Sequence, residues 1–267
     1  TLGPSGYGWT DNYNEYLSFD GSGNATVHNG NGSAVVFTFT SPSTYTAAPS
    51  EHVSLVKNGD GTFTLTDTGQ NQTVFNAAVS NLSTLAKLVD RHGGAAYTIT
   101  LAYNGDGTLA TVTDPASRTL TFSYQTIGTS KLISSVTDSA SPARTVSFQY
   151  GTNSSDPTTY LSLTQVTDVA GGLTKFTYDS NHYLLTMTDP NSGVTTNVYD
   201  SSTHRITSQK DPLLRTTTFS YAGFAGSLGM TTTVTDPKGN QVQEEYMNGM
   251  LFSRTIGYGT AQAATWT

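Results

Sequence analysis

The sequence predicts an all-β protein, an array of about seven repeated antiparallel β-hairpins that form a curved or spiralling sheet. Three observations support this fold class. An Asp recurs about every 24 residues, and in most units a Tyr follows it ten positions later. The 267-residue chain is only 35% hydrophobic and 12% charged, and it contains 26 Gly. Its many Thr and Tyr residues fit the pleated surface of strands, whereas Gly, Asn and Asp fit tight turns.

The repeat is marked by an Asp that in most units follows Thr or Val. Successive members are separated by 23, 24, 24, 30, 21, 22 and 25 residues, so the period is about 24 with insertions. Two strands of about six residues, with their turns, fill such a period. These Asp residues are Asp67, Asp90, Asp114, Asp138, Asp168, Asp189, Asp211 and Asp236.

A Tyr marks the end of the strand that returns from each turn. The ten-residue spacing is found at Tyr124, Tyr178, Tyr199, Tyr221 and Tyr246, with displaced equivalents at Tyr103 and Tyr150. Phe stands two residues before this Tyr at Phe122, Phe176, Phe219 and the displaced Phe148. Side chains two residues apart lie on one face of a strand. We therefore interpret the Asp as fixing the turn and the Tyr as closing a returning strand of constant length.

The strand before each Asp carries aliphatic residues five and two positions upstream, for example Leu109 and Val112 before Asp114. These two positions face opposite sides of a regular strand. Either a β-bulge lies between them or the strand is buried on both faces, and we favour the bulge.

The turns themselves have a recognisable chemistry. In the Asp-Pro units the Asp carboxylate accepts backbone hydrogen bonds and Pro presets φ, as in type I or type II turns. The Gly expected after the turn is present at Gly193 and Gly239, whereas Arg118, Arg144 and Arg215 replace it elsewhere.

The segment NGDGT occurs at 58–62 and 104–108 and superficially resembles a calcium loop. Calcium requires roughly six or more clustered oxygen ligands. These segments lack alternating acids and a terminal Glu, so they predict hairpin turns with positive-φ residues. The single Asp of each repeat likewise predicts turn capping rather than calcium binding.

The first residues are dense in aromatic side chains: Tyr7, Trp9, Tyr13, Tyr16 and Phe19. A repeat array needs a capping element, so we expect this cluster to plug the open end of the first repeat. The alternative is ligand binding by Tyr7, Trp9, Tyr13 and Tyr16, because exposed Trp and Tyr stack on sugar rings and anchor interfaces. The expected division is a capping segment over 1–54, a hairpin array over 55–260 and a truncated tail over 261–267.

Several functional classes are disfavoured. The net charge is −7 and the 12 Lys and Arg are scattered, so neither nucleic acid nor an anionic membrane is an expected partner. There is no Cys and no apolar run of the roughly 18 residues that span a bilayer. We interpret His182 and His204 as solvated turn residues rather than a paired site. With no Gly-x-Ser-x-Gly motif and no convergent pair of Glu, we expect no catalytic residue, metal or cofactor, and no enzymatic activity.

The Asp–Tyr spacing resembles the YD-repeat (Rhs) family, and Tyr-Asp is written at Tyr178-Asp179 and Tyr199-Asp200. The resemblance covers about residues 55–260, and the opening GYGW (6–9) is similar to the Gly-x-Gly-Trp segment that precedes such repeats. Family members build β-hairpin spirals, some of which close into shells around a C-terminal toxin or effector domain, as teneurins and toxin-complex components do. The DPxGxxGG-like motif that ends many of these shells is absent, so the resemblance implies the N-terminal part of a shell.

Three functions follow as hypotheses. The first is a non-catalytic structural fragment of a secreted bacterial YD-repeat protein, whose partners are further repeats and a C-terminal effector domain of the same chain. The second is an adhesin or carbohydrate-binding module that contacts glycans or another cell surface. The third is a stalk or filament-forming surface protein. All three place the chain outside the cell or on the bacterial surface, and the Thr/Ser/Asn/Gly-rich composition supports that location.

Overall fold

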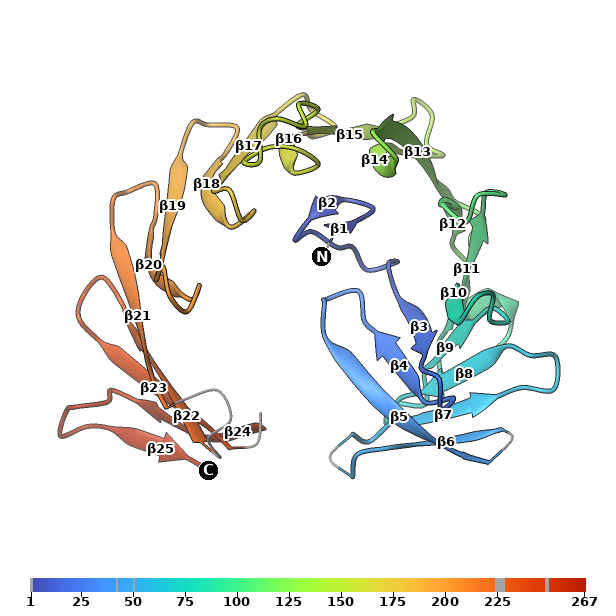
Figure 1. The fold of residues 1–267 in the computed structure, drawn as a ribbon, viewed down its shortest axis with the longest axis horizontal. Coiled ribbons are helices and arrows are strands. Elements are labelled where there is room, and N and C mark those ends of the chain that lie inside the picture. The colour runs from blue at the N-terminus through green and yellow to red at the C-terminus, as the bar shows by residue number, and fades with distance from the viewer. Residues whose placement is uncertain (1, 42, 50, 224–228, 248–249) are drawn as a thin grey trace. The chain divides into compact units, whose positions relative to one another are not determined.

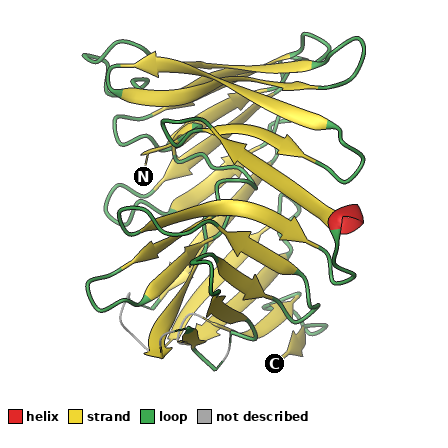
Figure 2. Ribbon diagram, turned by 90° about the vertical axis from the view of Figure 1, so that its right-hand side faces the viewer, coloured by secondary structure: helices red, strands yellow, loops and turns green. Residues whose placement is uncertain are grey.

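The computed structural model describes residues 2–41, 43–49, 51–223, 229–247 and 250–267. Apart from one short 3-10 helix, η1 (Ala95–Tyr97), every regular element among these residues is a β-strand, and the strand pairs described below are antiparallel (Figure 2). The predicted all-β fold of hairpin-linked strands is confirmed. The chain divides into two compact units, Thr1–Ser154 with Tyr160–Gly171, and Ser155–Thr159 with Gly172–Thr267.

The first unit contains eight consecutive strands whose pairing closes into a ring (Figure 1). They are β3 (Tyr16–Phe19), β4 (Ala25–His28), β5 (Ala34–Ser41), β6 (Thr44–Ala47), β7 (Ser54–Lys57), β8 (Phe63–Thr66), β9 (Gln72–Phe75) and β10 (Leu82–Val89). Inside the ring lies a core of fully buried side chains that includes Leu17, Phe37, Leu55, Phe75 and Leu85. The predicted boundary between residues 54 and 55 falls within β7, one of these eight strands.

Strand β10 joins the closed sheet to the repeats. Its first residues, Leu82 to Thr84, pair with β3, whereas Lys87 to Val89 pair with β11. From there the sheet continues antiparallel from strand to strand. Its strands are β11 (Thr98–Tyr103), β12 (Leu109–Thr113), β13 (Thr119–Ile127), β14 (Ser130–Asp138), β15 (Thr145–Tyr150) and β16 (Leu163–Thr167). A second core forms here around Val112, Phe122 and Ile133.

A small N-terminal hairpin, β1 (Leu2–Gly3) and β2 (Gly6–Tyr7), lies against this sheet. The amide of Ile133 donates to the Pro4 carbonyl at 2.8 Å, and the Tyr7 amide donates to the Leu161 carbonyl at 3.2 Å. Gly6 has φ 92°, and a Cβ there would lie 2.8 Å from the Leu161 oxygen. Only Gly therefore permits this approach. Leu161 belongs to the extra residues of the 30-residue interval, so that insertion helps to hold the chain's beginning.

The second unit repeats the same hairpin pattern. Its strands are β17 (Leu173–Tyr178), β18 (Leu184–Thr188), β19 (Val194–Tyr199), β20 (Ile206–Lys210), β21 (Thr216–Ala222), β22 (Gly229–Thr235), β23 (Gln241–Met247), β24 (Met250–Ile256) and β25 (Ala264–Trp266). The two units thus share one building block, although only the first contains a closed sheet among the described residues.

Each Asp turn has a defined geometry, shown by Asp114. The Ser117 amide donates to the Asp114 carbonyl and the Asp114 amide donates to the Arg118 carbonyl, both at 3.0 Å. Ser117 has φ 63°, whereas Ala116 is not among the residues with positive φ. A type II turn requires positive φ at its third residue, so this is a type I turn followed by a left-handed residue. The predicted choice between the two types is thereby resolved.

The two glycines predicted to be equivalent are not. Gly239 occupies the left-handed position three residues after Asp236, with φ 86°. Gly193 instead lies four residues after Asp189, and Ser192 holds the left-handed position there with φ 69°. Arg118 and Arg215 likewise follow a left-handed residue, Ser117 and Leu214, whereas Arg144 lies six residues after Asp138 in a longer turn without a positive-φ residue.

The predicted β-bulge is confirmed. Ala102 pairs with Thr111 and Tyr103 with Leu109, so the pairing skips Ala110, between the two aliphatic positions. The same register shift recurs opposite Tyr124, Tyr150, Tyr178, Tyr199 and Tyr246. Because one extra residue turns the following side chains to the other face, both upstream aliphatic positions can pack on the same side.

Candidate functional site

The repeated tyrosines are tied to the backbone of the preceding strand. The hydroxyl of Tyr124 donates to the Leu109 carbonyl, 15 residues earlier, at 2.9 Å. Leu109 is the aliphatic residue five positions before Asp114. The equivalent bonds in other units are Tyr103 to Leu85, Tyr150 to Ile133, Tyr199 to Leu184 and Tyr221 to Ile206. The Asp–Tyr spacing therefore places a phenol within reach of one particular carbonyl.

Tyr246 departs from this pattern. Its hydroxyl donates to Glu244 Oε2 at 2.7 Å rather than to a backbone carbonyl. The residue five positions before Asp236 is Thr231, and its strand β22 pairs with both neighbours without a register shift. We call the hydrogen bond from a repeat Tyr hydroxyl to the backbone carbonyl of the preceding strand the tyrosine clamp. The clamp is thus found where the strand that supplies the carbonyl contains a β-bulge.

The repeated aspartates act as turn caps, as predicted. Asp114 Oδ1 accepts the amides of Ala116 and Arg118 at 2.9 Å each, and Asp114 Oδ2 accepts Arg118 Nε at 2.6 Å. Arg144 and Arg215 make the same contact with Asp138 and Asp211. The Arg118 hydrogen bond, with the backbone amides, lowers the pKa of Asp114. Where Arg is absent, Asn240 donates to Asp236 instead.

The other predicted turn residues also take defined positions. Gly61 and Gly107 in the two NGDGT segments have φ 86° and 84°, which confirms hairpin turns with positive-φ residues. His182 and His204 occupy left-handed positions of the looser turns. The His204 ring stacks on Tyr183 at 5.3 Å between centroids. Within the described part of the chain, no group of three or more His, Cys, Asp or Glu is arranged to hold a metal.

Three aromatic residues of the N-terminal segment, Tyr7, Tyr13 and Tyr16, can be placed by their strands or ring contacts. Tyr7 lies in β2, and Tyr13 meets Phe122 edge-on at 6.4 Å between centroids. Tyr16 stacks on His28 at 4.3 Å. Trp9, Tyr16 and His28 line a common cavity of about 390 Å³, together with Asn14, Asn29 and Ser33. Ligand binding by Tyr7, Trp9, Tyr13 and Tyr16 stays a prediction.

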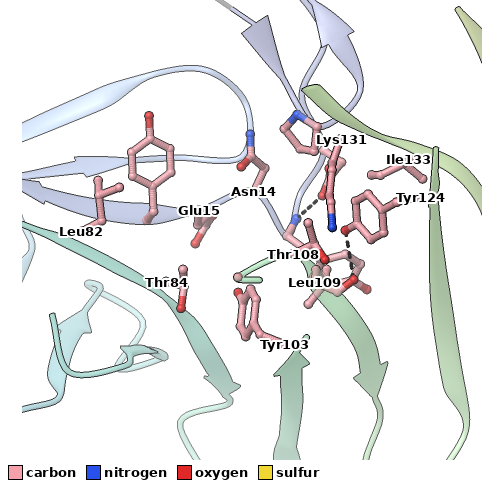
Figure 3. Close-up of a pocket in the computed structure, with 15 residues that line it drawn as sticks. Asn14, Glu15, Leu82, Thr84, Tyr103, Thr108, Leu109, Tyr124, Lys131 and Ile133 are labelled. Carbon is pink, nitrogen blue, oxygen red and sulfur yellow. Dashed lines mark hydrogen bonds between the residues drawn. The ribbon is translucent and has the colours of Figure 1, made fainter. Parts of the chain in front are cut away.

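A second cavity of about 390 Å³ lies in the first unit, between the N-terminal segment, the closed sheet and the first repeats (Figure 3). We call it the tyrosine pocket, because four tyrosines line it. Its lining comprises Pro4, Asp11, Tyr13, Asn14, Glu15, Tyr16, Leu82, Thr84, Tyr103, Gly107, Thr108, Leu109, Tyr124, Lys131 and Ile133. Tyr103 and Tyr124 are repeat tyrosines, so side chains that hold the hairpins together also line this pocket.

Several titratable groups that line the tyrosine pocket have pKa values raised by burial. Burial raises the pKa of both Asp11 and Glu15. Burial also raises the pKa of Tyr103 to about 12, and burial together with the negative charge of Asp11 raises that of Tyr124 to about 12. Lys131 forms an ion pair with Asp106.

The position of Asp11 follows from local structure. The Asp11 side chain accepts the Tyr13 amide at 2.9 Å, and its carbonyl accepts the Asn14 amide at 3.0 Å. Gly30 in the β4–β5 turn approaches so closely that a Cβ would lie 2.7 Å from the Asp11 carbonyl oxygen. Asp11 lies outside the residues predicted from the sequence, where the Asx-turn pattern around it was the available signal.

Comparison with protein families connects this geometry to known sequences. The model of the RHS Repeat family matches residues 163–194. Residues 163–194 therefore match an RHS repeat. The matched segment begins at Leu163, contains Asp168 and Tyr178, and extends past Asp189. The predicted resemblance to the YD-repeat (Rhs) family is thereby confirmed.

The search of curated proteins gives no match to the chain. Similar solved structures include a TcdB2-TccC3-TEV crystal structure, 10% identical with a TM-score of 0.30 over 90% of this chain and 18% of that chain. A TcdB2-TccC3 crystal structure is 12% identical with a TM-score of 0.27 over 90% of this chain and 20% of that chain. The chain therefore spans about a fifth of their length.

A porin-like protein from Bacteroides uniformis is 13% identical, with a TM-score of 0.36 over 96% of both chains. At identities and TM-scores this low, none of these likenesses supports a conclusion about function. The described residues contain no helix long and apolar enough to cross a membrane.

Proposed function

We propose that this RHS-repeat chain is a non-catalytic structural segment of a longer, secreted bacterial protein, in which repeats enclose or present a C-terminal toxin or effector domain. The observation that supports it best is the hydrogen bond from the repeat tyrosine to the backbone, made by Tyr103, Tyr124, Tyr150, Tyr199 and Tyr221. The side chains that recur with the period are engaged in holding hairpins together, which suits a wall better than a reaction centre.

The role of the wall is containment. A rigid sheet keeps an enclosed domain away from proteases and from its target until delivery. The RHS match over residues 163–194 supports the family context of this role. The expected location is outside the cell or on its surface, and the expected partners are further repeats and the effector domain of the same protein.

The test is to determine the coding sequence that follows Thr267 and to express the full-length protein and its C-terminal region separately. Further repeats and a small unrelated domain that is toxic alone, but resistant to protease within the full-length protein, would support containment. A wall anchor or membrane span after a few more repeats, with no toxic domain, would contradict it.

The cavity that contains Trp9 favours a second candidate function, binding of a glycan. Trp9 and Tyr16 contribute aromatic rings to its lining, and Asn14, Asn29 and Ser33 contribute polar groups. Aromatic faces beside amide and hydroxyl groups suit a sugar ring. The measurement is tryptophan emission during titration with oligosaccharides. The Trp9→Ala variant should lose the response, whereas Trp266→Ala, which removes the other Trp in exposed strand β25, should retain it.

A further inference from the structure

The tyrosine pocket presents hydrogen-bond acceptors to its interior. Tyr103 donates its hydroxyl hydrogen to the Leu85 carbonyl at 2.7 Å, and Tyr124 donates its own to Leu109 at 2.9 Å. A phenol that has used its one hydrogen can only accept further hydrogen bonds. Both phenols stay protonated at neutral pH, since their pKa values are raised to about 12.

The one cation of the lining is already neutralised. Lys131 Nζ donates to Asp106 Oδ2, a carboxylate on the β11–β12 turn. The Lys131 hydrogen bond is the main cause of a strongly lowered pKa at Asp106, so that carboxylate stays ionised beside the ammonium. The pair as a whole therefore adds no net charge to the pocket.

Two carboxylates in the lining have no cationic partner among the described residues. Asp11 Oδ1 accepts the Tyr13 amide, and none of the ion pairs of the described residues includes Asp11. Glu15 has only a long contact, 3.5 Å from its Oε1 to the Gly30 amide. Both carboxylates are partly removed from water, and a buried carboxylate is costly unless a cation or several donors compensate it.

The remaining lining is apolar and aromatic. Leu109 and Ile133 lie near the ring of Tyr124, and Leu82 lines the opposite side of the pocket (Figure 3). Aromatic faces attract ammonium groups within about 6 Å, and they also pack against hydrocarbon chains. A cavity of about 390 Å³ is in the usual range for small-molecule sites.

We propose that the tyrosine pocket binds a small organic amine, with its ammonium group at the carboxylates of Asp11 and Glu15 and its hydrocarbon body against Tyr103 and Tyr124. An acceptor-rich lining with two uncompensated negative charges disfavours anions. A neutral ligand would leave these two negative charges uncompensated. An alkyl amine or diamine supplies several N–H donors, positive charge and methylene groups in one molecule. This site is independent of whether the repeats enclose an effector.

The experiment is calorimetric titration of the 267-residue chain with 1,4-diaminobutane, with butyrate and 1-butanol as comparison ligands. The variants are Asp11→Asn and Glu15→Gln, alone and combined. Asn retains the Oδ1 that accepts the Tyr13 amide, so the local turn should survive. The combined variant should bind the diamine at least about tenfold more weakly, the change expected from losing one charge-assisted hydrogen bond.

The matched control is Glu51→Gln, which removes the same charge at an exposed position outside the pocket. It should bind the diamine as the parent chain does. Equal losses in Glu51→Gln and Glu15→Gln would attribute binding to net charge and overturn the proposal. Tighter binding of butyrate, no binding of the diamine at millimolar concentration, or full affinity in the combined variant would also overturn it.

The pH dependence gives a separate readout. The titratable groups at the pocket are Asp11 and Glu15, Lys131 with Asp106, and the phenols of the lining. The carboxyls of Asp11 and Glu15, whose pKa values are raised, are expected to become protonated between about pH 7 and about pH 4. Because burial raises both pKa values, diamine affinity should fall over this range as the carboxyls become protonated. An affinity that stays constant to pH 4 would contradict the assignment.

Discussion

The hydroxyl of Tyr124 on β13 lies 2.9 Å from the carbonyl oxygen of Leu109 at the start of β12. Leu109 is displaced from regular pairing by the bulge between it and Thr111. The Tyr124 hydroxyl therefore donates a hydrogen bond to a carbonyl beside the β-bulge. This relationship links the three periodic features of the sequence: the aliphatic residue, the turn Asp and the Tyr.

Removal of this hydroxyl should destabilise the protein modestly. Tyr124→Phe keeps the ring but leaves the Leu109 carbonyl without its donor, which costs about 1 kcal/mol of the free energy of unfolding. Urea denaturation followed by circular dichroism measures the change. Tyr97→Phe is the matched control, because Tyr97 is 50% exposed and its hydroxyl makes no hydrogen bond within the described structure. Equal effects of the two changes would contradict a specific clamp.

The turn aspartate should matter more than its arginine. Asp114→Ala removes the acceptor of two backbone amides, whereas Arg118→Ala removes an exposed ion pair and leaves the capped turn. We expect Asp114→Ala to lower the melting temperature clearly and Arg118→Ala to change it little, since exposed ion pairs contribute little. Asp114→Asn should fall between them, because the amide oxygen can still accept the backbone hydrogen bonds. The reverse order in thermal denaturation would show that the ion pair, not the cap, holds the turn.

The capping aspartates should also make stability sensitive to acid. Hydrogen bonds from Arg118 and Asn240 lower the pKa of Asp114 and Asp236 respectively. A carboxyl whose pKa is lower in the folded state stabilises the fold above its unfolded pKa of about 4 and loses this contribution as pH falls. The urea midpoint should therefore change little from about pH 7 to about pH 5 and decrease below about pH 4.

Ionisation of Asp11 should have the opposite effect on stability. Its pKa is raised on folding, so the ionised group opposes folding above that pKa. Asp11→Asn should accordingly raise the urea midpoint at pH 7 and lose this advantage as the pH approaches 4. A lower midpoint at pH 7 would show that the carboxylate contributes more to the local turn than its burial costs.

The repeats are far more predictable than the pocket. Asp114 and Tyr124 stand ten residues apart, so their spacing, the turn and the bulge are local relationships that recur along the sequence. Asp11 and Tyr103, by contrast, are far apart in sequence and meet because β10 pairs with both β3 and β11. No local pattern encodes that shared edge. Closure of β3 onto β10 was missed for the same reason, since the strands from β3 to β7 lack the Asp–Tyr marker.

The contact of Gly6 with the repeats leads to the last prediction. Gly6→Ala places a methyl group 2.8 Å from the Leu161 carbonyl oxygen and 3.2 Å from the Tyr150 ring, at φ 92°. The N-terminal hairpin should detach from β14 and β16 and become sensitive to limited proteolysis, while the core of the closed sheet persists. Tryptophan emission should shift to longer wavelength as Trp9 becomes hydrated.

Gly8→Ala is the matched control for this change. Gly8 also has positive φ, 74°, but nothing lies within 4 Å of a Cβ there. It therefore incurs only the backbone strain of a left-handed residue, about 1–2 kcal/mol, without a steric clash. Because that strain can be relieved within the segment, the hairpin should remain protected from protease in Gly8→Ala and not in Gly6→Ala. Equal protection in both would mean that the contact with Leu161 yields easily and does not hold the N-terminal hairpin in place.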